Sequence, residues 1–144
     1  MRVASSALSL FTTFDRANPL KLPALTALNE DGSVNRKDNP AAAGSVMSLF
    51  GSGLGVLSPP LLTGGLNPGS PSTRSVQYQA CVGCSEILFL GSASGLSTGI
   101  AQINVRLPAG PTGSDVQVLG IGIVASDTLP GLSAYSPTGV VFVK

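Results

Sequence analysis

Apolar and polar residues alternate along several short runs of this chain, and the clearest run covers residues 100–107. Aliphatic side chains take every second position there and polar side chains take the positions between, namely Ile103, Val105 and Leu107 against Gln102, Asn104 and Arg106. Successive side chains of a strand point to opposite faces of a sheet, so this period predicts a half-buried strand. Pro108 ends the run because it has no backbone N–H to donate to a neighbouring strand.

Other runs also predict strands, because each is short, apolar or alternating, and bounded by turn-forming residues. They cover residues 4–11, 25–28, 45–50, 75–79, 86–90, 116–123 and 139–143. In 116–123 the apolar phase changes around Gly120, which predicts either a bulge or a strand buried on both faces. Helical apolar spacing is interrupted by Gly or Pro almost everywhere. We therefore predict an all-β fold, an immunoglobulin-like sandwich of two antiparallel sheets with seven to eight short strands.

The length of 144 residues fits one domain, 1–144, in which residues 1–24 are interpreted as a variable N-terminal strand and insertion. A signal peptide is disfavoured there, because the apolar run is Ser-rich and lacks a cleavage site, so any export signal is expected upstream. Phe50, Phe89 and Phe142 lie inside predicted strands and are expected in the core.

The low charge of the chain excludes several classes of partner. Only 10% of the residues are charged, against about a quarter in an average soluble protein. Eight Lys and Arg against seven Asp and Glu give a net charge of +1, and the basic residues are scattered. We therefore expect no nucleic acid and no anionic membrane as partner. No apolar stretch approaches the roughly 18 residues of a membrane span, so no membrane insertion is expected.

Catalysis lacks its usual residues. The chain has no His, so neither a Ser-His-Asp nor a Cys-His arrangement can be built. The run Gly91–Gly95 resembles a nucleophile elbow, but Ala93 stands where the nucleophile would be. The seven acidic residues fall mostly in turns or at strand starts, where Asp caps backbone amides. We predict that the protein is not an enzyme and has no cofactor and no metal.

Two ligand hypotheses arise in residues 27–55, where turn signals alternate with short apolar runs. Oxygen-bearing side chains at alternate positions from Asn29 to Asn35 suggest calcium, but the glycine comes too early for an EF-type loop and no acid closes it. The glycines of residues 51–55 suggest a phosphate-binding loop, but the following Val-Leu-Ser-Pro-Pro cannot begin the required helix. A hairpin turn and a chain reversal explain the two motifs better.

The only two cysteines form a Cys-x-x-Cys run, Cys81 to Cys84. Haem attachment would need His in place of Ser85, and structural zinc needs four ligands where the chain offers two Cys and no His. A redox dithiol needs a helix after its first Cys, whereas the residues after Cys84 predict a strand. The ends of a four-residue turn lie within about 7 Å, which a disulfide spans. We favour a disulfide across the turn, with free thiols as the alternative.

The succession of these motifs resembles a known family. The elements that carry the resemblance are Asn29–Asn35, Asn39–Ala41, Gly44–Val46, Gly51–Gly55, Glu86–Gly91 and Gln102–Pro108. Their order resembles the uncharacterised C-terminal domain family of large secreted acidobacterial proteins, the Solibacter type, over most of the chain. The resemblance implies an immunoglobulin-like module that is exported to the cell surface or the extracellular space, and it implies no activity. Residues Asp15–Lys21 depart from the pattern and look like an insertion.

Two functional hypotheses remain open. The first is a non-catalytic structural or adhesive module of an exported bacterial surface protein, a spacer, terminal cap or assembly interface whose partners are neighbouring domains or identical subunits. The second is a module that binds a glycan or another surface polymer through residues 58–73, which exceed the usual length of a connection, with Tyr78 or Tyr135 as contacts. With no Trp and two Tyr, the aromatic platform for a sugar would be thin.

Overall fold

The computed structural model describes residues 7–13, 23–73, 78–110, 115–126 and 139–144, which form ten strands. The strands are β1 Ser9–Leu10, β2 Thr12–Thr13, β3 Ala24–Leu25, β4 Ala27–Leu28, β5 Val46–Ser52, β6 Tyr78–Val82, β7 Glu86–Ser92, β8 Ile100–Arg106, β9 Gln117–Ser126 and β10 Gly139–Val143. Within these ranges there is no helix long and apolar enough to cross a membrane. The predicted all-β class is confirmed.

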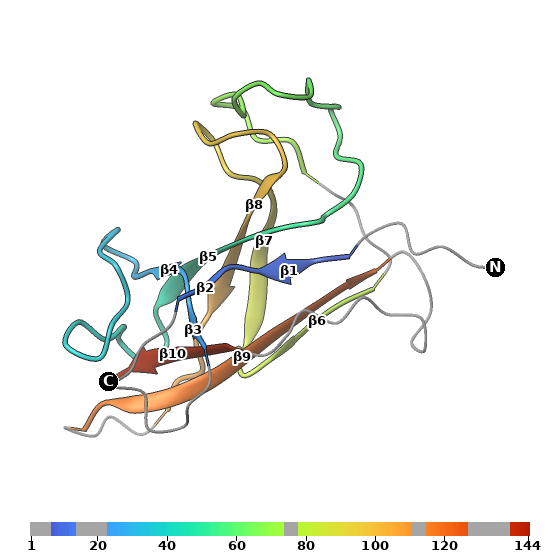
Figure 1. The fold of residues 1–144 in the computed structure, drawn as a ribbon. Coiled ribbons are helices and arrows are strands. Elements are labelled where there is room, and N and C mark those ends of the chain that lie inside the picture. The colour runs from blue at the N-terminus through green and yellow to red at the C-terminus, as the bar shows by residue number, and fades with distance from the viewer. Residues whose placement is uncertain (1–6, 14–22, 74–77, 111–114, 127–138) are drawn as a thin grey trace.

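The strands form two five-stranded sheets that pack face to face (Figure 1). The first has the order β1-β5-β8-β7, with β4 also paired to β5, and the second has the order β2-β3-β10-β9-β6. Lettered along the chain, β1-β5-β8-β7 corresponds to the A-B-E-D sheet of an immunoglobulin sandwich, and β10-β9-β6 to its G-F-C sheet. The predicted sandwich is confirmed, and its strand order is that of the immunoglobulin type.

The N-terminal part of the chain raises the number of strands to ten, because it divides into four two-residue strands, of which the outer two join the first sheet and the inner two the second. β1 and β4 pair with β5 of the first sheet, while β2 pairs with β3 of the second. β3 pairs with β10 in parallel, through Ala24 and Val140, so the second sheet is mixed where a purely antiparallel one was predicted. Sequence periodicity shows a strand, but it contains no information on the direction of its neighbour.

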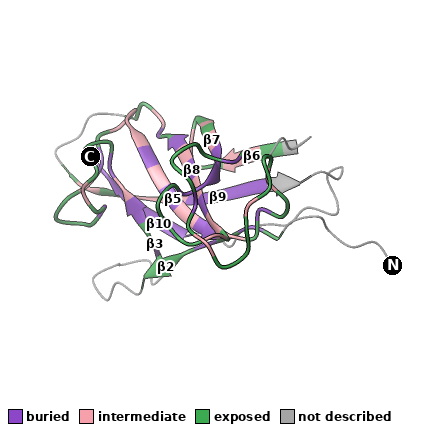
Figure 2. Ribbon diagram, turned by 90° about the horizontal axis from the view of Figure 1, so that it is seen from above, coloured by how far each residue is buried: buried purple, intermediate pink, exposed green. Residues whose placement is uncertain are grey.

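The main core lies between the two sheets, and Figure 2 shows the buried residues on the strands and the exposed ones mostly on the loops. Its fully buried side chains come mostly from β5, β8 and β9, and include Met47, Leu49, Ile103, Val105, Ile121 and Ile123. The alternation in residues 100–107 therefore has the predicted consequence, with the aliphatic positions turned inward. β9 is buried on both faces, because Leu119 packs on the main core while Val118 packs on a second cluster of Ala24, Val140 and Phe142.

Two of the three phenylalanines do not take the predicted core positions. Phe142 is buried, in the second cluster. Phe50 is half-buried, because Met47 and Leu49 take the inward phase of β5 and leave Phe50 on the opposite face. Phe89 is also half-buried, and it follows a bulge in β7 at Leu88, where the register against β8 shifts. The bulge lies in β7, whereas the pairing of β9 with β6 and β10 is regular.

Candidate interaction surface

Two loops meet at one end of the sandwich. Residues 53–73 follow β5 and residues 93–99 join β7 to β8. Because β8 pairs antiparallel with both β5 and β7, the end of β5, the end of β7 and the start of β8 lie together. The two loops project from this end of the molecule (Figure 1). We call residues 53–73 and 93–101 the loop end.

Backbone hydrogen bonds hold the long loop in place. Ser58 and Thr73 form an antiparallel bridge, in which the backbone N of each donates to the carbonyl O of the other, at 2.9 Å from Ser58 and 3.0 Å from Thr73. Farther along, the N–H of Thr98 donates to the carbonyl of Gly65 at 3.0 Å, and the N–H of Ser92 donates to that of Ser72 at 2.8 Å. The predicted long connection is therefore tied at both its base and its middle.

Asn67 is the centre of the contact between the two loops. The residue is 3% exposed, and Nδ2 lies within hydrogen-bond distance of three carbonyls, those of Ala93 at 2.7 Å and Ser97 at 3.3 Å in the shorter loop and that of Ile100 at 3.2 Å at the start of β8. Its backbone N–H donates to the carbonyl of Leu96 at 2.7 Å. A buried amide that satisfies several backbone carbonyls fixes the relative position of the segments that carry them.

A cavity of about 420 Å³ lies between the loops. Its lining is aliphatic apart from backbone, glycines and two hydroxyls, and comprises residues 53–57, Pro60, Leu61, Thr63 and residues 98–101. None of these lining residues has a side chain that titrates, so the cavity offers no general acid or base.

Large aliphatic side chains are exposed around this cavity. Leu62 is 86% exposed, Val56 83% and Leu66 72%, while Leu96 is 41% exposed. Single exposed aliphatic residues are ordinary on a protein surface, but a group of them gathered at one site indicates an interaction surface. Four of the eight large hydrophobic side chains that are exposed in the described structure belong to the loop end.

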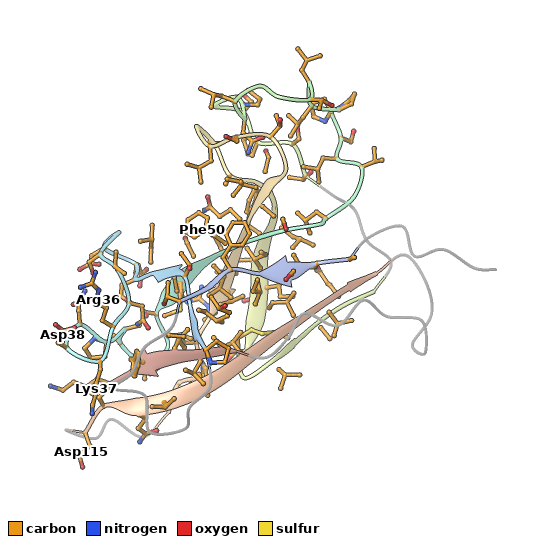
Figure 3. All side chains as sticks on the ribbon, viewed as in Figure 1. Arg36, Lys37, Asp38, Phe50 and Asp115 are labelled. Atoms are coloured by element: carbon orange, nitrogen blue, oxygen red, sulfur yellow. A yellow bond between two sulfur atoms is a disulfide. The ribbon has the colours of Figure 1, made fainter. Side chains whose placement is uncertain are left out.

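Charge is separated from this surface. No charged residue occurs in the sequence between Asp38 and Arg74 or between Glu86 and Arg106, which includes both loops. Figure 3 shows Arg36, Lys37, Asp38 and Asp115 at the end of the molecule opposite the loops. Glu86 and Arg106 approach each other to 3.8 Å where β7 begins and β8 ends, which is also away from the loops. Among the described residues, the charged side chains therefore lie away from the loop end, and we call the end that carries Arg36, Lys37, Asp38 and Asp115 the charged end.

Cys81 and Cys84 are paired as a disulfide, as favoured from the sequence, with Cα atoms 5.6 Å apart. The pair spans the turn between β6 of the second sheet and β7 of the first, and both cysteines pack against the main core. Gly83 in this turn has φ of +80° and its Cα faces the backbone carbonyl of Gly120, where a Cβ would collide. The motif therefore positions a corner between the sheets and lies away from the loop end.

The loop considered for calcium is filled by hydrogen bonds of its own side chains. Asp31 Oδ1 accepts from Ser33, at 2.6 Å from the hydroxyl and 2.9 Å from the backbone N–H, and these bonds lower the pKa of Asp31. Nδ2 of Asn29 and Nδ2 of Asn39 both donate to Ser33 Oγ. A cation site needs oxygen acceptors that converge on the ion, whereas amide N–H donors point into this loop and disfavour cation binding. The described residues contain no cluster of three or more His, Cys, Asp or Glu.

The glycine-rich run of residues 51–55 also has a structural explanation. A Cβ on Gly51 would collide with the carbonyl of Ser9, and one on Gly53 with that of Ala7. Gly53 has a φ of +86°, which L side chains rarely adopt. The glycines therefore let the N-terminal strand pass close to the end of β5, as expected of a chain reversal.

The prediction of Tyr78 and Tyr135 as ligand contacts stays a prediction. Tyr78 is the first residue of β6 and pairs with Ser126, while its side chain and the whole of Tyr135 lie outside the described structure. Asn67, Leu62 and Leu66 were missed as site residues. The available signal was the absence of charge from the sequences of both loops.

Comparison with protein-family models, with curated proteins and with solved structures finds no match to this chain. The proposals below therefore rest on the sequence and on the geometry of the loop end.

Proposed function

We propose that this chain is a non-catalytic structural or adhesive module of an exported bacterial surface protein, and that the loop end is its assembly interface. The observation that carries the proposal is a pair of loops, without a charged residue, that expose Val56, Leu62 and Leu66 and enclose an aliphatic cavity. Burial of such side chains against a neighbouring domain or subunit is favourable, at roughly 25 cal/mol per Å² of apolar surface. No charged group has to be desolvated in the process.

Further features support a non-catalytic module and its export. The cavity lining contains no titratable side chain, and the sequence contains no His. The charged residues shown in Figure 3 lie at the other end of the molecule. A disulfide between Cys81 and Cys84 is typical of proteins that fold in an oxidising compartment, which agrees with export. The resemblance to secreted acidobacterial modules points in the same direction.

Cross-linking in the cells that produce the protein tests the proposal. A photo-reactive amino acid in place of Leu66 should form a covalent product with a neighbouring domain or subunit, identified by mass spectrometry. The matched control replaces Val34, an exposed aliphatic residue of the charged end, and should give no product. No product from Leu66, or the same product from both positions, would refute the loop end as the interface.

The glycan hypothesis gives a different result in a direct binding measurement. If the loop end is an assembly interface, a glycan array should show no signal that depends on Tyr78 or Tyr135. A signal that is lost in Tyr78→Ala or Tyr135→Ala and retained in Leu62→Glu would favour the surface-polymer module over the assembly interface.

A further inference from the structure

The loop end carries a protruding side chain and a recess next to each other. Leu62 is 86% exposed, and the residue before it, Leu61, lines the cavity of about 420 Å³. Val56 belongs to both features, because it lines the cavity and is 83% exposed. The protrusion and the recess are both aliphatic and lie within one surface.

We propose that the loop end binds a second copy of this chain head to head, about a twofold axis, with Leu62 of each copy entering the cavity of the other. The inference rests on the proposed function and names the partner of that interface. A twofold contact uses the same patch on both subunits, so it needs both the inserted group and its recess within one patch. The loop end meets this condition because Leu61 and Leu62 are adjacent.

The distribution of charge determines the orientation of the two copies. A head-to-tail contact would place the loop end of one copy against an end that carries Arg36, Lys37 and Asp38 and would remove water from their charges (Figure 3). A head-to-head contact joins two surfaces to which residues 53–73 and 93–101 contribute no charge. Apolar burial then drives association without opposing electrostatic repulsion.

Other occupants fit this surface less well. An anionic lipid surface attracts Lys and Arg, which both loops lack. A sugar favours aromatic faces, and no residue of 53–73 or 93–101 is aromatic. The remaining partner is a protein with an aliphatic surface, and the loop end of a second copy of this chain is such a surface.

Hydrogen bonds between the loops prepare the surface for binding. Asn67 Nδ2 holds the carbonyl of Ala93 at 2.7 Å, and the N–H of Thr98 holds that of Gly65 at 3.0 Å. The two walls of the cavity are thereby joined to each other before a partner arrives. Association then loses less conformational entropy than it would with two independent loops.

Sedimentation equilibrium of the purified, oxidised chain tests the dimer. The wild type should change from monomer to dimer with concentration, and Leu62→Glu should weaken the dimer by about tenfold or more. The control Val34→Glu introduces the same charge at another exposed aliphatic position, at the charged end, and should dimerise like the wild type. A wild type that is monomeric up to about 1 mM would overturn the proposal, as would a dimer that Leu62→Glu leaves unchanged.

A mixed cross-linking experiment tests the insertion itself. Chains with Leu62→Cys and mass-tagged chains with Thr98→Cys, a residue of the cavity lining, are mixed and treated with a short bismaleimide. With equal amounts of the two chains, random pairing alone would give about twice as much mixed product as either homodimeric product. The proposed geometry predicts a mixed product well above that ratio, and a ratio no higher than random pairing would contradict it. A monomeric chain that nevertheless forms the Leu66 product with a different protein in cells would refute the dimer and leave the proposed function standing.

Discussion

The side-chain amide of Asn35 forms two hydrogen bonds with the backbone of Phe142, one as donor from Nδ2 and one as acceptor at Oδ1, each 2.8 Å long. A neighbouring strand would supply the same pair of bonds. The Asn35 side chain thus takes the place of a strand neighbour at Phe142 of β10, next to the parallel bridge between Ala41 and Val143. Asn35 Nδ2 also donates to Asn29 Oδ1 at 2.9 Å, which connects the turn at residues 29–39 to the second sheet.

Asn35→Ala should lower the free energy of unfolding by about 2–3 kcal/mol, because it leaves the buried polar groups of Phe142 without this partner. Urea unfolding followed by circular dichroism measures the change. Asn39→Ala is the control, because it removes an amide of the same turn whose hydrogen bonds are exposed, and it should cost less than about 1 kcal/mol. Equal losses in the two variants would contradict the structural role of Asn35.

Asn67→Ala should destabilise the loop end, because the carbonyls of Ala93, Ser97 and Ile100 lose a shared donor. We expect a loss of about 2 kcal/mol in the free energy of unfolding and faster amide hydrogen exchange in residues 65–67 and 93–100. The control is Ser94→Ala, which removes a hydroxyl whose hydrogen bond to the Gly69 carbonyl is exposed and long, and it should change neither quantity. Exchange in the loops that is unchanged by Asn67→Ala would show that they do not depend on this side chain.

Substitutions at Gly83 and Gly64 distinguish the cost of a left-handed backbone from the cost of a steric collision by an added Cβ. Both have φ near +80°, but a Cβ on Gly83 would collide with the carbonyl of Gly120, whereas none of the described atoms lies within 4 Å of a Cβ on Gly64. Gly64→Ala should therefore cost about 1 kcal/mol, the penalty of the left-handed conformation alone. Gly83→Ala should cost about 3 kcal/mol, because overpacking adds to that penalty. Thermal unfolding of both variants compares them, and equal losses would exclude the close approach of the turn to β9.

Asp31 should titrate below the usual range for an aspartate, because the hydroxyl of Ser33 and then its backbone N–H stabilise the carboxylate and lower the pKa. NMR titration measures this pKa, and Ser33→Ala should raise it. A lowered pKa in the folded state contributes stability above the unfolded pKa, and this contribution is lost as the pH falls through the folded value. An Asp31 pKa that is unchanged by Ser33→Ala would assign the shift to another cause.

Strand positions could be predicted because alternation is a local property. Residues 100–107, 86–90 and 139–143 were expected as strands and coincide closely with β8, β7 and β10. The position of Phe50 was predicted less well, since an aromatic residue within a short apolar run satisfies either phase. The inward side of β5 is determined by the contacts of Met47 and Leu49 with the opposite sheet.

The residues that hold the candidate surface together could not be identified locally. Asn35 and Phe142 are separated by 107 positions, and Asn67 and Ile100 by 33. An asparagine near a turn is usually explained by the turn itself. Nothing in the neighbouring sequence distinguishes an exposed turn amide from one that completes the edge of a distant strand.

The sequence by itself determined the all-β class, most of the strands, the pairing of Cys81 with Cys84 as the favoured state, and the absence of charge from residues 39–73 and 87–105. Period and composition are read over a few residues and need no partner. Only the tertiary structure placed the two uncharged loops at one end and formed a cavity between them. The reason is that antiparallel pairing of β8 with both β5 and β7 brings together chain ends that are far apart in sequence.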